Sequence, residues 1–425
     1  MQKTKVIQLL RGLKTKELKQ FKIYVASPYF NTNKRVIRLL DFLIRFAPHF
    51  TNIKCSKENG YAYVFETASA YHDQKMRNVF SVLTRLAEGF IWQQEIQLQP
   101  NAQSPFLLEG LYKRQLDKQF VQHLKTIRQQ QAKEKQQDIP HFYERFQLAD
   151  LTYTFGVATQ HRSALSSDLQ AVTNHLDVFY IGSKLRYACA MLNQKSILEV
   201  SHQLPIMTTI LTYLEQNTLD HIPLIGTYYR LYKLLQTEST SNYQNLNDYL
   251  QANHQALPKS ELRQVYTALF NYCNKQLKTG KDHYLRTIFE LYQLMLAQEI
   301  LIADGFISPY QHYRNVVIAA LKLKEIAWAN QFIEDYKDKL RPEHRENMYH
   351  YCKAALLFYQ NQFHDSLQHL LYFEFTAPYH YVEHKTLLAK TYFELAEWEA
   401  LNDLLQAFKT YLRRNKQLPS HFKQG

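Results

Sequence analysis

The sequence predicts an all-α protein, and three features of the chain support this class. Glycine and proline are scarce, at 10 and 12 of 425 residues, whereas sheets and glycine-rich loops depend on the turns that these residues form. Apolar residues recur at helical spacing, and no segment shows sustained alternation of apolar and polar residues. Hydrophobic residues make up 46% of the chain, which is ample for a buried core. We expect an N-terminal helical domain followed by an α-solenoid of antiparallel helix pairs.

Short helices are expected in the first part of the chain. Thr15 is expected to cap the second helix, which stops at Ser27 because Pro28 pushes the preceding residue out of the α region. The first expected helix ends near Gly12. The following ones are expected, in chain order, from Thr15 to Ser27, from Asn31 or Thr32 to about Ala47, from Ser56 to Phe65, from Asp73 to Trp92, and over 106–136.

Pro140 follows a polar, glutamine-rich run and marks the expected boundary between two domains, 1–138 and 139–425. Beyond it the sequence predicts helix after helix, because breakers recur between apolar segments. These breakers are Pro205, Pro223, Pro258, Gly280, Pro309, Pro342 and Pro378.

Internal similarity is strongest in the last hundred residues. Ala319, Ala354 and Ala389 are 35 residues apart, and each is followed nine residues later by an aromatic residue. Small residues let two antiparallel helices approach closely, and the rings fill the groove between helix pairs. The residues expected to pack the repeats are Ala319, Trp328, Ala354, Phe363, Ala389, Tyr392 and Trp398.

With this spacing, the segment 310–416 resembles the tetratricopeptide-repeat family, and the similarity decays upstream. The resemblance implies a right-handed superhelix whose concave groove recognises a protein or peptide. It transfers no binding residues, since the lysine and asparagine pattern of a carboxylate clamp is not legible here. The sequence departs from the family pattern at the turn glycine (Ile326, Asn361, Ala396), at the second small position (Gln331, Ser366, Leu401) and at the closing proline of the last unit (Arg413).

Positive charge is concentrated near the N-terminus. Residues 1–140 hold 23 Lys and Arg against 11 Asp and Glu, whereas residues 141–425 hold 28 against 27. Within residues 1–57 the count is 13 basic to 2 acidic. Such asymmetry suggests that the N-terminal region faces something anionic.

Two expected helices carry this charge, and they are the candidate contact for an anion or nucleic acid. Neutralising several phosphates along such a face would give salt-dependent, sequence-tolerant binding. An acidic protein partner and a solvated face that only aids solubility remain open as alternatives. The candidate contact residues are Lys16, Lys19, Lys22, Lys34, Arg35, Arg38 and Arg45.

The cysteines and the hydropathy indicate the cellular compartment in which the protein is expected. Cys55, Cys189, Cys273 and Cys352 are widely spaced, which is typical of free thiols in a reducing cytoplasm. The first 16 residues lack the apolar stretch of a signal peptide, and no run approaches the roughly 20 apolar residues that span a bilayer. We therefore expect a soluble cytoplasmic protein that does not bind a membrane.

One string resembles a catalytic motif. His380, Glu383 and His384 match the H-x-x-E-H arrangement in which two His bind Zn²⁺ and the Glu activates water. The simpler interpretation is two His on a repeat helix, because a chain with 18 His is expected to contain such pairs by chance. Glycine-rich phosphate loops and the G-x-S-x-G elbow are absent from the sequence.

The function predicted from these patterns is that of an interaction scaffold that binds an unidentified protein or peptide through its helical repeats. We expect no catalysis, no cofactor and no bound metal. The alternative is a nucleic-acid-associated protein that docks on phosphates through its basic N-terminal helices.

Overall fold

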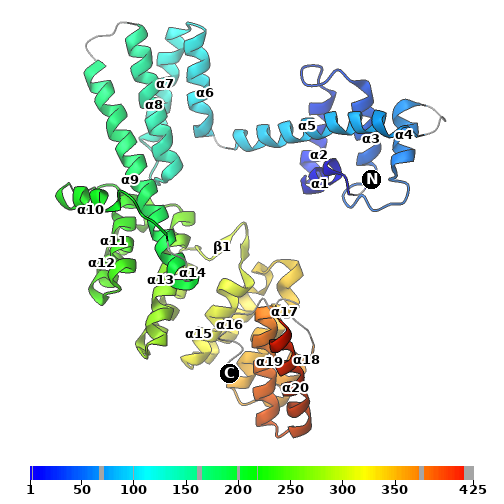
Figure 1. Ribbon diagram of the computed structural model, residues 1–425, viewed down its shortest axis with the longest axis vertical. Helices are drawn as coiled ribbons and strands as arrows, with labels where there is room; N and C mark the ends of the chain where they lie inside the picture. Colours follow the sequence, from blue (N-terminus) through cyan, green and yellow to red (C-terminus); the bar gives the residue numbers. More distant parts are fainter. Residues whose placement is uncertain are drawn as a thin grey trace. The chain divides into compact units, whose positions relative to one another are not determined.

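The computed structural model describes residues 1, 3–66, 71–98, 100–159, 165–198, 202–217, 219–372 and 378–415. Twenty α-helices account for nearly all of the regular structure in these ranges (Figure 1), so the predicted all-α class is confirmed. A single antiparallel pair of two-residue strands, β1 (Ile302–Ala303) and β2 (Phe306–Ile307), lies in a part of the chain where no sheet was expected. No helix among the described residues is long and apolar enough to cross a membrane.

The chain divides into two compact units. Unit 1 contains residues 1–133 and 144–172, and unit 2 contains residues 134–143 and 173–425. The expected boundary at Pro140 therefore differs from the observed division. Pro140 lies in the first turn of a helix, where proline is tolerated because the missing N–H would have no intrahelical partner.

Unit 1 contains two hydrophobic cores. The first is enclosed by five helices and includes the fully buried side chains of Phe21, Leu39 and Leu83. The second lies among the next three helices, where the rings of Phe120 and Phe155 stack at 4.2 Å. The helices are α1 (Lys5–Gly12), α2 (Thr15–Ala26), α3 (Lys34–Ile44), α4 (Lys57–Phe65), α5 (Asp73–Gln97), α6 (Pro100–Lys113), α7 (Asp117–Gln131) and α8 (Ile139–Ala158), which begins in unit 2.

The N-terminal helices begin close to where the sequence places them, but the caps of two of them differ from the expected residues. Lys14, not Thr15, precedes α2, and its backbone N–H donates to the Glu17 carboxylate at 2.6 Å. Asn33, not Asn31 or Thr32, precedes α3, and its side chain accepts from the N–H of Arg35. A side-chain acceptor at this position satisfies one of the N–H groups that a helix start leaves without a partner.

The single long helix expected over 106–136 is two helices. Gln115, between α6 and α7, has a φ of 55°, a left-handed conformation that ends the helix and turns the chain back. The two helices then pack against each other. No glycine or proline stands at this turn, which is why the sequence pattern did not reveal it.

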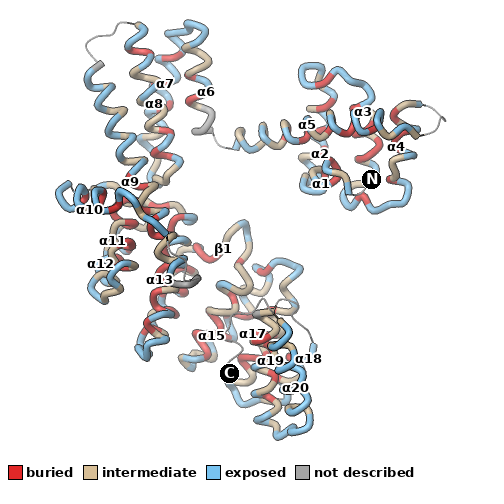
Figure 2. Tube along the Cα trace, in the orientation of Figure 1, coloured by how far each residue is buried: buried red, intermediate tan, exposed pale blue. Residues whose placement is uncertain are grey.

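Unit 2 is a succession of helix pairs, in which α11 packs with α12, α13 with α14, α15 with α16, α17 with α18 and α19 with α20. Buried residues line the inner faces of these pairs, and the outer faces are largely exposed (Figure 2). The helices are α9 (Leu165–Leu198), which enters unit 2 at Thr173, α10 (Met207–Gln216), α11 (Pro223–Thr237), α12 (Thr240–Asn253), α13 (Lys259–Lys278), α14 (His283–Ala297), α15 (Arg314–Lys322), α16 (Ile326–Tyr336), α17 (Pro342–Tyr359), α18 (Phe363–Leu371), α19 (Pro378–Glu394) and α20 (Trp398–Arg414).

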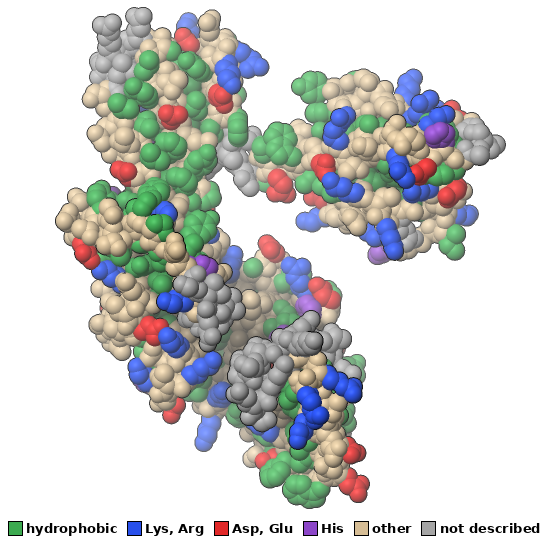
Figure 3. Space-filling view, viewed as in Figure 1, with side chains coloured by type: hydrophobic (Ala, Val, Ile, Leu, Met, Phe, Trp, Pro, Cys, Tyr) green, Lys and Arg blue, Asp and Glu red, His purple; other side chains and the backbone are tan. Residues whose placement is uncertain are grey.

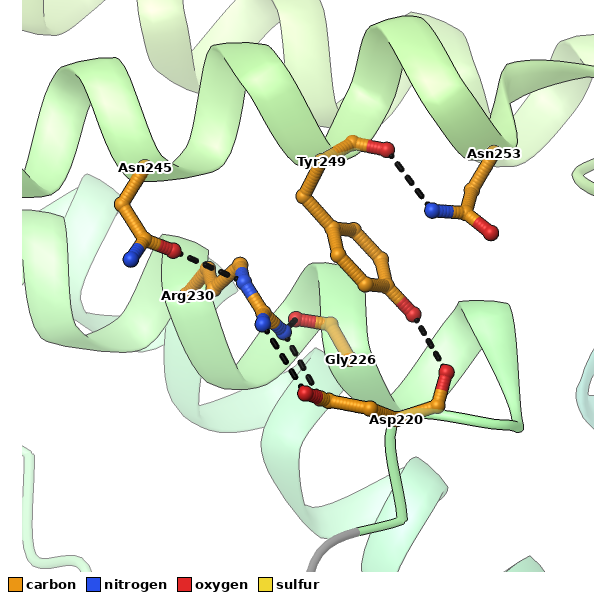
Figure 4. Close-up of polar contacts among 6 residues, drawn as sticks. All are labelled: Asp220, Gly226, Arg230, Asn245, Tyr249 and Asn253. Carbon is orange, nitrogen blue, oxygen red and sulfur yellow. Dashed lines mark hydrogen bonds and ion pairs between the residues drawn. The ribbon is translucent and has the colours of Figure 1, made fainter.

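A polar cluster ties the α11–α12 pair to the segment that precedes it (Figure 4). The Arg230 guanidinium donates to both carboxylate oxygens of Asp220, at 2.8 and 3.0 Å, and to Asn245 at 2.8 Å. It also stacks over the Tyr249 ring, 4.0 Å from the centroid, and the Tyr249 hydroxyl donates to the Asp220 carbonyl at 2.9 Å. The ring lies directly against Gly226, so the absence of a side chain at Gly226 creates the space for it.

Candidate interaction surfaces

Of the seven basic residues proposed as an anion contact, three are exposed and have no ion pair within the described ranges. These are Lys16 and Lys19 on α2 and Lys34 at the start of α3. The other four contact groups of their own unit. Lys22 pairs with Asp41 at 2.7 Å, Arg38 pairs with Glu66 at 2.7 Å, Arg35 stacks over Phe65, and Arg45 donates to the Tyr63 hydroxyl at 2.6 Å.

These contacts reduce the basic face that the sequence predicted. Most of the α3 cations turn toward α4, whose residues Tyr63 and Phe65 were not expected to receive them. Exposed ion pairs are worth about 0–1 kcal/mol each, so an external anion could displace them at small cost. Lys16, Lys19 and Lys34 remain the cations of this group that need no displacement.

The turns within the C-terminal helix pairs have a common geometry. Three residues separate α15 from α16, α17 from α18, and α19 from α20. The middle residue of each turn is left-handed: Lys324 with φ 61°, Asn361 with φ 61° and Ala396 with φ 59°. Asn361 and Ala396 are the positions at which the sequence analysis placed the turn residue. The first turn is centred on Lys324 and not on Ile326.

This difference changes the register of the first repeat by two residues. Ala354 and Ala389 each lie seven residues before the left-handed residue, whereas Ala319 lies only five residues before it. Ala319 and Trp328 therefore are not structurally equivalent to Ala354 and Phe363, although their spacing in sequence is 35 residues. The strict 35-residue period holds between the α17–α18 and α19–α20 pairs.

The residues expected to pack the repeats differ in burial. Ala354 is fully buried and its carbonyl accepts from the buried Ser366 hydroxyl at 2.9 Å. Ala319 is buried, Trp328 and Tyr392 pack against the hydrophobic clusters from partly buried positions, and Ala389 and Phe363 are half-buried. Trp398, in contrast, is 58% exposed, and its ring lies edge-to-face with the Phe393 ring at a centroid distance of 5.6 Å.

A groove between α14 and α16 is lined by three aromatic rings, of which Trp328 and Tyr336 are half-buried and Phe332 is buried. Trp328, Phe332 and Tyr336 follow one another along α16 with one turn between them, and their rings stack at centroid distances of 5.4 and 4.9 Å. The groove has a volume of about 290 Å³ and is completed by Leu296, Gln293, Gln331 and Asp335. We call it the Trp328 groove. No basic side chain lines the groove. The side chains of Gln293, Gln331 and Asp335 have no hydrogen bond or ion pair within the described part of the chain.

The His380-to-His384 string does not form a metal centre. The His384 side chain is 1% exposed and its Nε2 hydrogen-bonds to the Leu370 carbonyl at 2.9 Å. His380 stacks on Tyr310 with 3.5 Å between ring centroids, while the Glu383 carboxylate pairs with Arg314 at 2.5 Å. Within the described ranges, no group of three His, Cys, Asp or Glu side chains is placed to hold a metal ion.

A buried carboxylate joins α9, α11 and α13, and the sequence analysis did not predict it. Glu261 is 3% exposed, accepts a hydrogen bond from the Tyr228 hydroxyl, and lies 3.2 Å from Nε of Arg186. Burial is the largest influence on the pKa of Arg186 and lowers it, but the Glu261 charge together with the contacts of Tyr228 and Tyr187 makes the net shift upward. Burial, followed by the charge of Glu261, raises the pKa of Tyr228. Single-sequence spacing gives no signal for this cluster, because each of the three residues comes from a different helix.

Comparison of the chain with protein families, with curated proteins and with solved structures finds no match. The proposals that follow therefore rest on the geometry described above.

Proposed function

We propose that this protein is a non-enzymatic interaction scaffold and that it binds a protein or peptide through its C-terminal helix pairs. The Trp328 groove is the observation that carries this proposal. Stacked rings and unpartnered polar side chains, side by side in a groove, are typical of surfaces that bind peptides, since the rings supply contact area at little cost in entropy. The proposal extends the tetratricopeptide-like interpretation of the α15–α20 segment.

The proposal places the scaffold in a reducing cytoplasm. All four cysteines, Cys55, Cys189, Cys273 and Cys352, are buried and free, which is typical of proteins from that compartment.

Selection from a random peptide library displayed against the full chain tests the proposal. Selected peptides are then titrated against the parent and against Gln331→Trp and Gln293→Trp, which would fill the groove from exposed positions. We expect each filled variant to lose at least about tenfold in affinity. Gln368→Trp, an exposed residue of α18 outside the groove, should bind like the parent. Recovery of no peptide, or equal binding by all four proteins, would contradict the proposal.

A second candidate function is docking on nucleic acid through unit 1. The exposed and unpaired Lys16, Lys19 and Lys34 favour it, as does the charge excess in residues 1–57. Each phosphate that is neutralised releases counterions, so binding should fall steeply with salt.

The test is a salt series with labelled single- and double-stranded DNA and RNA. The variant carries Glu at Lys16, Lys19 and Lys34, and a matched control carries Glu at Lys118, Lys125 and Lys133, which are exposed elsewhere in unit 1. A phosphate-docking face predicts tight, salt-sensitive binding that only the first variant loses. Equal loss of nucleic-acid binding in both variants would show that binding depends on net charge alone and not on this face.

A further inference from the structure

A cavity of about 350 Å³ lies between α9 and the segment 203–207 that leads into α10. Its walls are mostly apolar and include the rings of Phe179, Tyr180 and Tyr187 and the side chains of Met191 and Met207. Tyr180 and Tyr187 are 37% and 58% exposed, so aromatic surface continues from the cavity to the outside of the helix. Hydrophobic side chains gather over this part of unit 2 in Figure 3.

Two polar groups stand together in this apolar lining. Ser183 and Lys184 are adjacent on α9, and both line the cavity. The Ser183 hydroxyl is buried without a hydrogen-bond partner. Lys184 lies 5.8 Å from the centroid of the Tyr180 ring and forms no ion pair within the described residues. A buried hydroxyl without a hydrogen-bond partner is unfavourable, so Ser183 and Lys184 form a polar site that a ligand could satisfy.

The charge of the lining selects the ligand. Lys184 contributes a positive charge and the cavity has no acidic side chain, so a cationic ligand would be repelled. A neutral hydrocarbon would leave the Lys184 ammonium and the Ser183 hydroxyl without partners. A carboxylate accepts hydrogen bonds from both, and its apolar body fits against the rings and methionines.

We propose that this cavity, here called the Lys184 cavity, binds a free carboxylic acid with a hydrocarbon body. The carboxylate lies against Lys184 and Ser183, and the hydrocarbon chain lies along Phe179, Tyr187 and Met207. The site is separate from the Trp328 groove and does not depend on the function proposed for that groove.

Calorimetric titration of the full chain with three probes of equal chain length tests the proposal. Octanoate carries a negative charge, 1-octanol is neutral, and octyltrimethylammonium is positive. Because a hydrogen bond to a charged group is stronger than a neutral one, we expect octanoate to bind about tenfold or more tighter than octanol. The cation should bind more weakly than either.

Lys184→Met keeps the apolar stem and removes the charge. In this variant octanoate should lose the whole advantage over octanol, while octanol binding stays unchanged. Ser183→Ala should weaken octanoate by a smaller factor. Lys195→Met, an exposed lysine of the same helix outside the cavity, should bind all three probes like the parent.

Three results would overturn the proposal. If octanoate binds without saturation, or binds equally to the parent and Lys184→Met, the cavity has no anion site. In the third result, light scattering would find a dimer that Tyr187→Glu disperses, so that a second copy of the chain and not a carboxylic acid covers the face.

Discussion

Gly226→Ala should destabilise the α11–α12 pair, although alanine is the better helix former. A Cβ added at this position would lie 2.2 Å from the Tyr249 hydroxyl oxygen, 2.5 Å from Cζ and 3.1 Å from Cε1. Non-bonded carbon atoms rest at about 3.5–4.0 Å, so the ring must move. Arg230 stacks on that ring and the Tyr249 hydroxyl donates to the Asp220 carbonyl, and the movement therefore strains the whole cluster of Figure 4.

The magnitude follows from three contributions. Overpacking at a buried position costs about 1–3 kcal/mol. Loss of the hydrogen bond from Tyr249 to Asp220 costs about 1 kcal/mol more. Exchange of glycine for alanine within a helix stabilises by about 1 kcal/mol. The expected net destabilisation is about 1–3 kcal/mol.

Hydrogen exchange measured by mass spectrometry on peptides from α11 and α12 gives the local effect, and urea unfolding gives the change for the chain. Gly110→Ala on α6 is the matched control, because a Cβ there meets only the end of the Arg114 side chain at 3.5 Å. The control should gain up to about 1 kcal/mol. Tyr249→Leu in the Gly226→Ala background should recover part of the loss, since it removes the clashing ring. Unchanged exchange in Gly226→Ala would refute the reasoning.

Three further predictions concern buried and paired groups. Arg186→Met should lower the free energy of unfolding by about 3 kcal/mol, at the low end for a buried pair because the Arg186 side chain is 23% exposed. The double variant Arg186→Met with Glu261→Gln should lose less, because it leaves no buried charge without a partner. Urea unfolding measures both variants, and equal losses of stability would be contrary evidence. A hydrogen bond from Lys353, together with Lys337, lowers the pKa of Glu334 from 4.5 to about 2, so the pairing stabilises α16 against α17 fully above pH 4.5 and is lost as the pH falls toward 2. The difference in stability between Glu334→Gln and the parent should therefore be full above pH 4.5 and shrink progressively toward pH 2, as a pH series of unfolding curves would show. Burial raises the pKa of Cys189, Cys273 and Cys352, to about 12 for Cys273, so a thiol reagent should modify these cysteines only at the rate of unfolding, and rapid reaction in the native chain would be inconsistent with their burial.

The helices were predictable where apolar periodicity and breakers agree. The stop of α2 before Pro28 and the start of α17 at Pro342 follow from prolines that are visible in the sequence. The start of α3 was expected at Asn31 or Thr32, and the capping residue is Asn33. The turn at Gln115 was missed because its left-handed residue is neither Gly nor Asn. The same cause hid the turn at Lys324 and produced the two-residue error in the first repeat.

The candidate sites were less predictable, because they depend on contacts between distant segments. The sequence revealed the excess of cations in residues 1–57, but not that Asp41, Tyr63 and Glu66 engage three of them. Trp328 was expected to pack the repeats, and its alignment with Phe332 and Tyr336 beside α14 became evident only in the structure. The Lys184 cavity needed the segment 203–207 to be placed against α9.

The emission of Trp328 during titration with a selected peptide tests the central claim most directly. The chain has three tryptophans, and Trp92 and Trp398 are 66% and 58% exposed, so Trp92→Phe with Trp398→Phe should leave the fold intact and Trp328 as the only reporter. The account predicts a saturable change in emission, with a midpoint equal to the dissociation constant found independently by calorimetry. Binding of the peptide with unchanged Trp328 emission would contradict the assignment of the groove between α14 and α16 as the binding site.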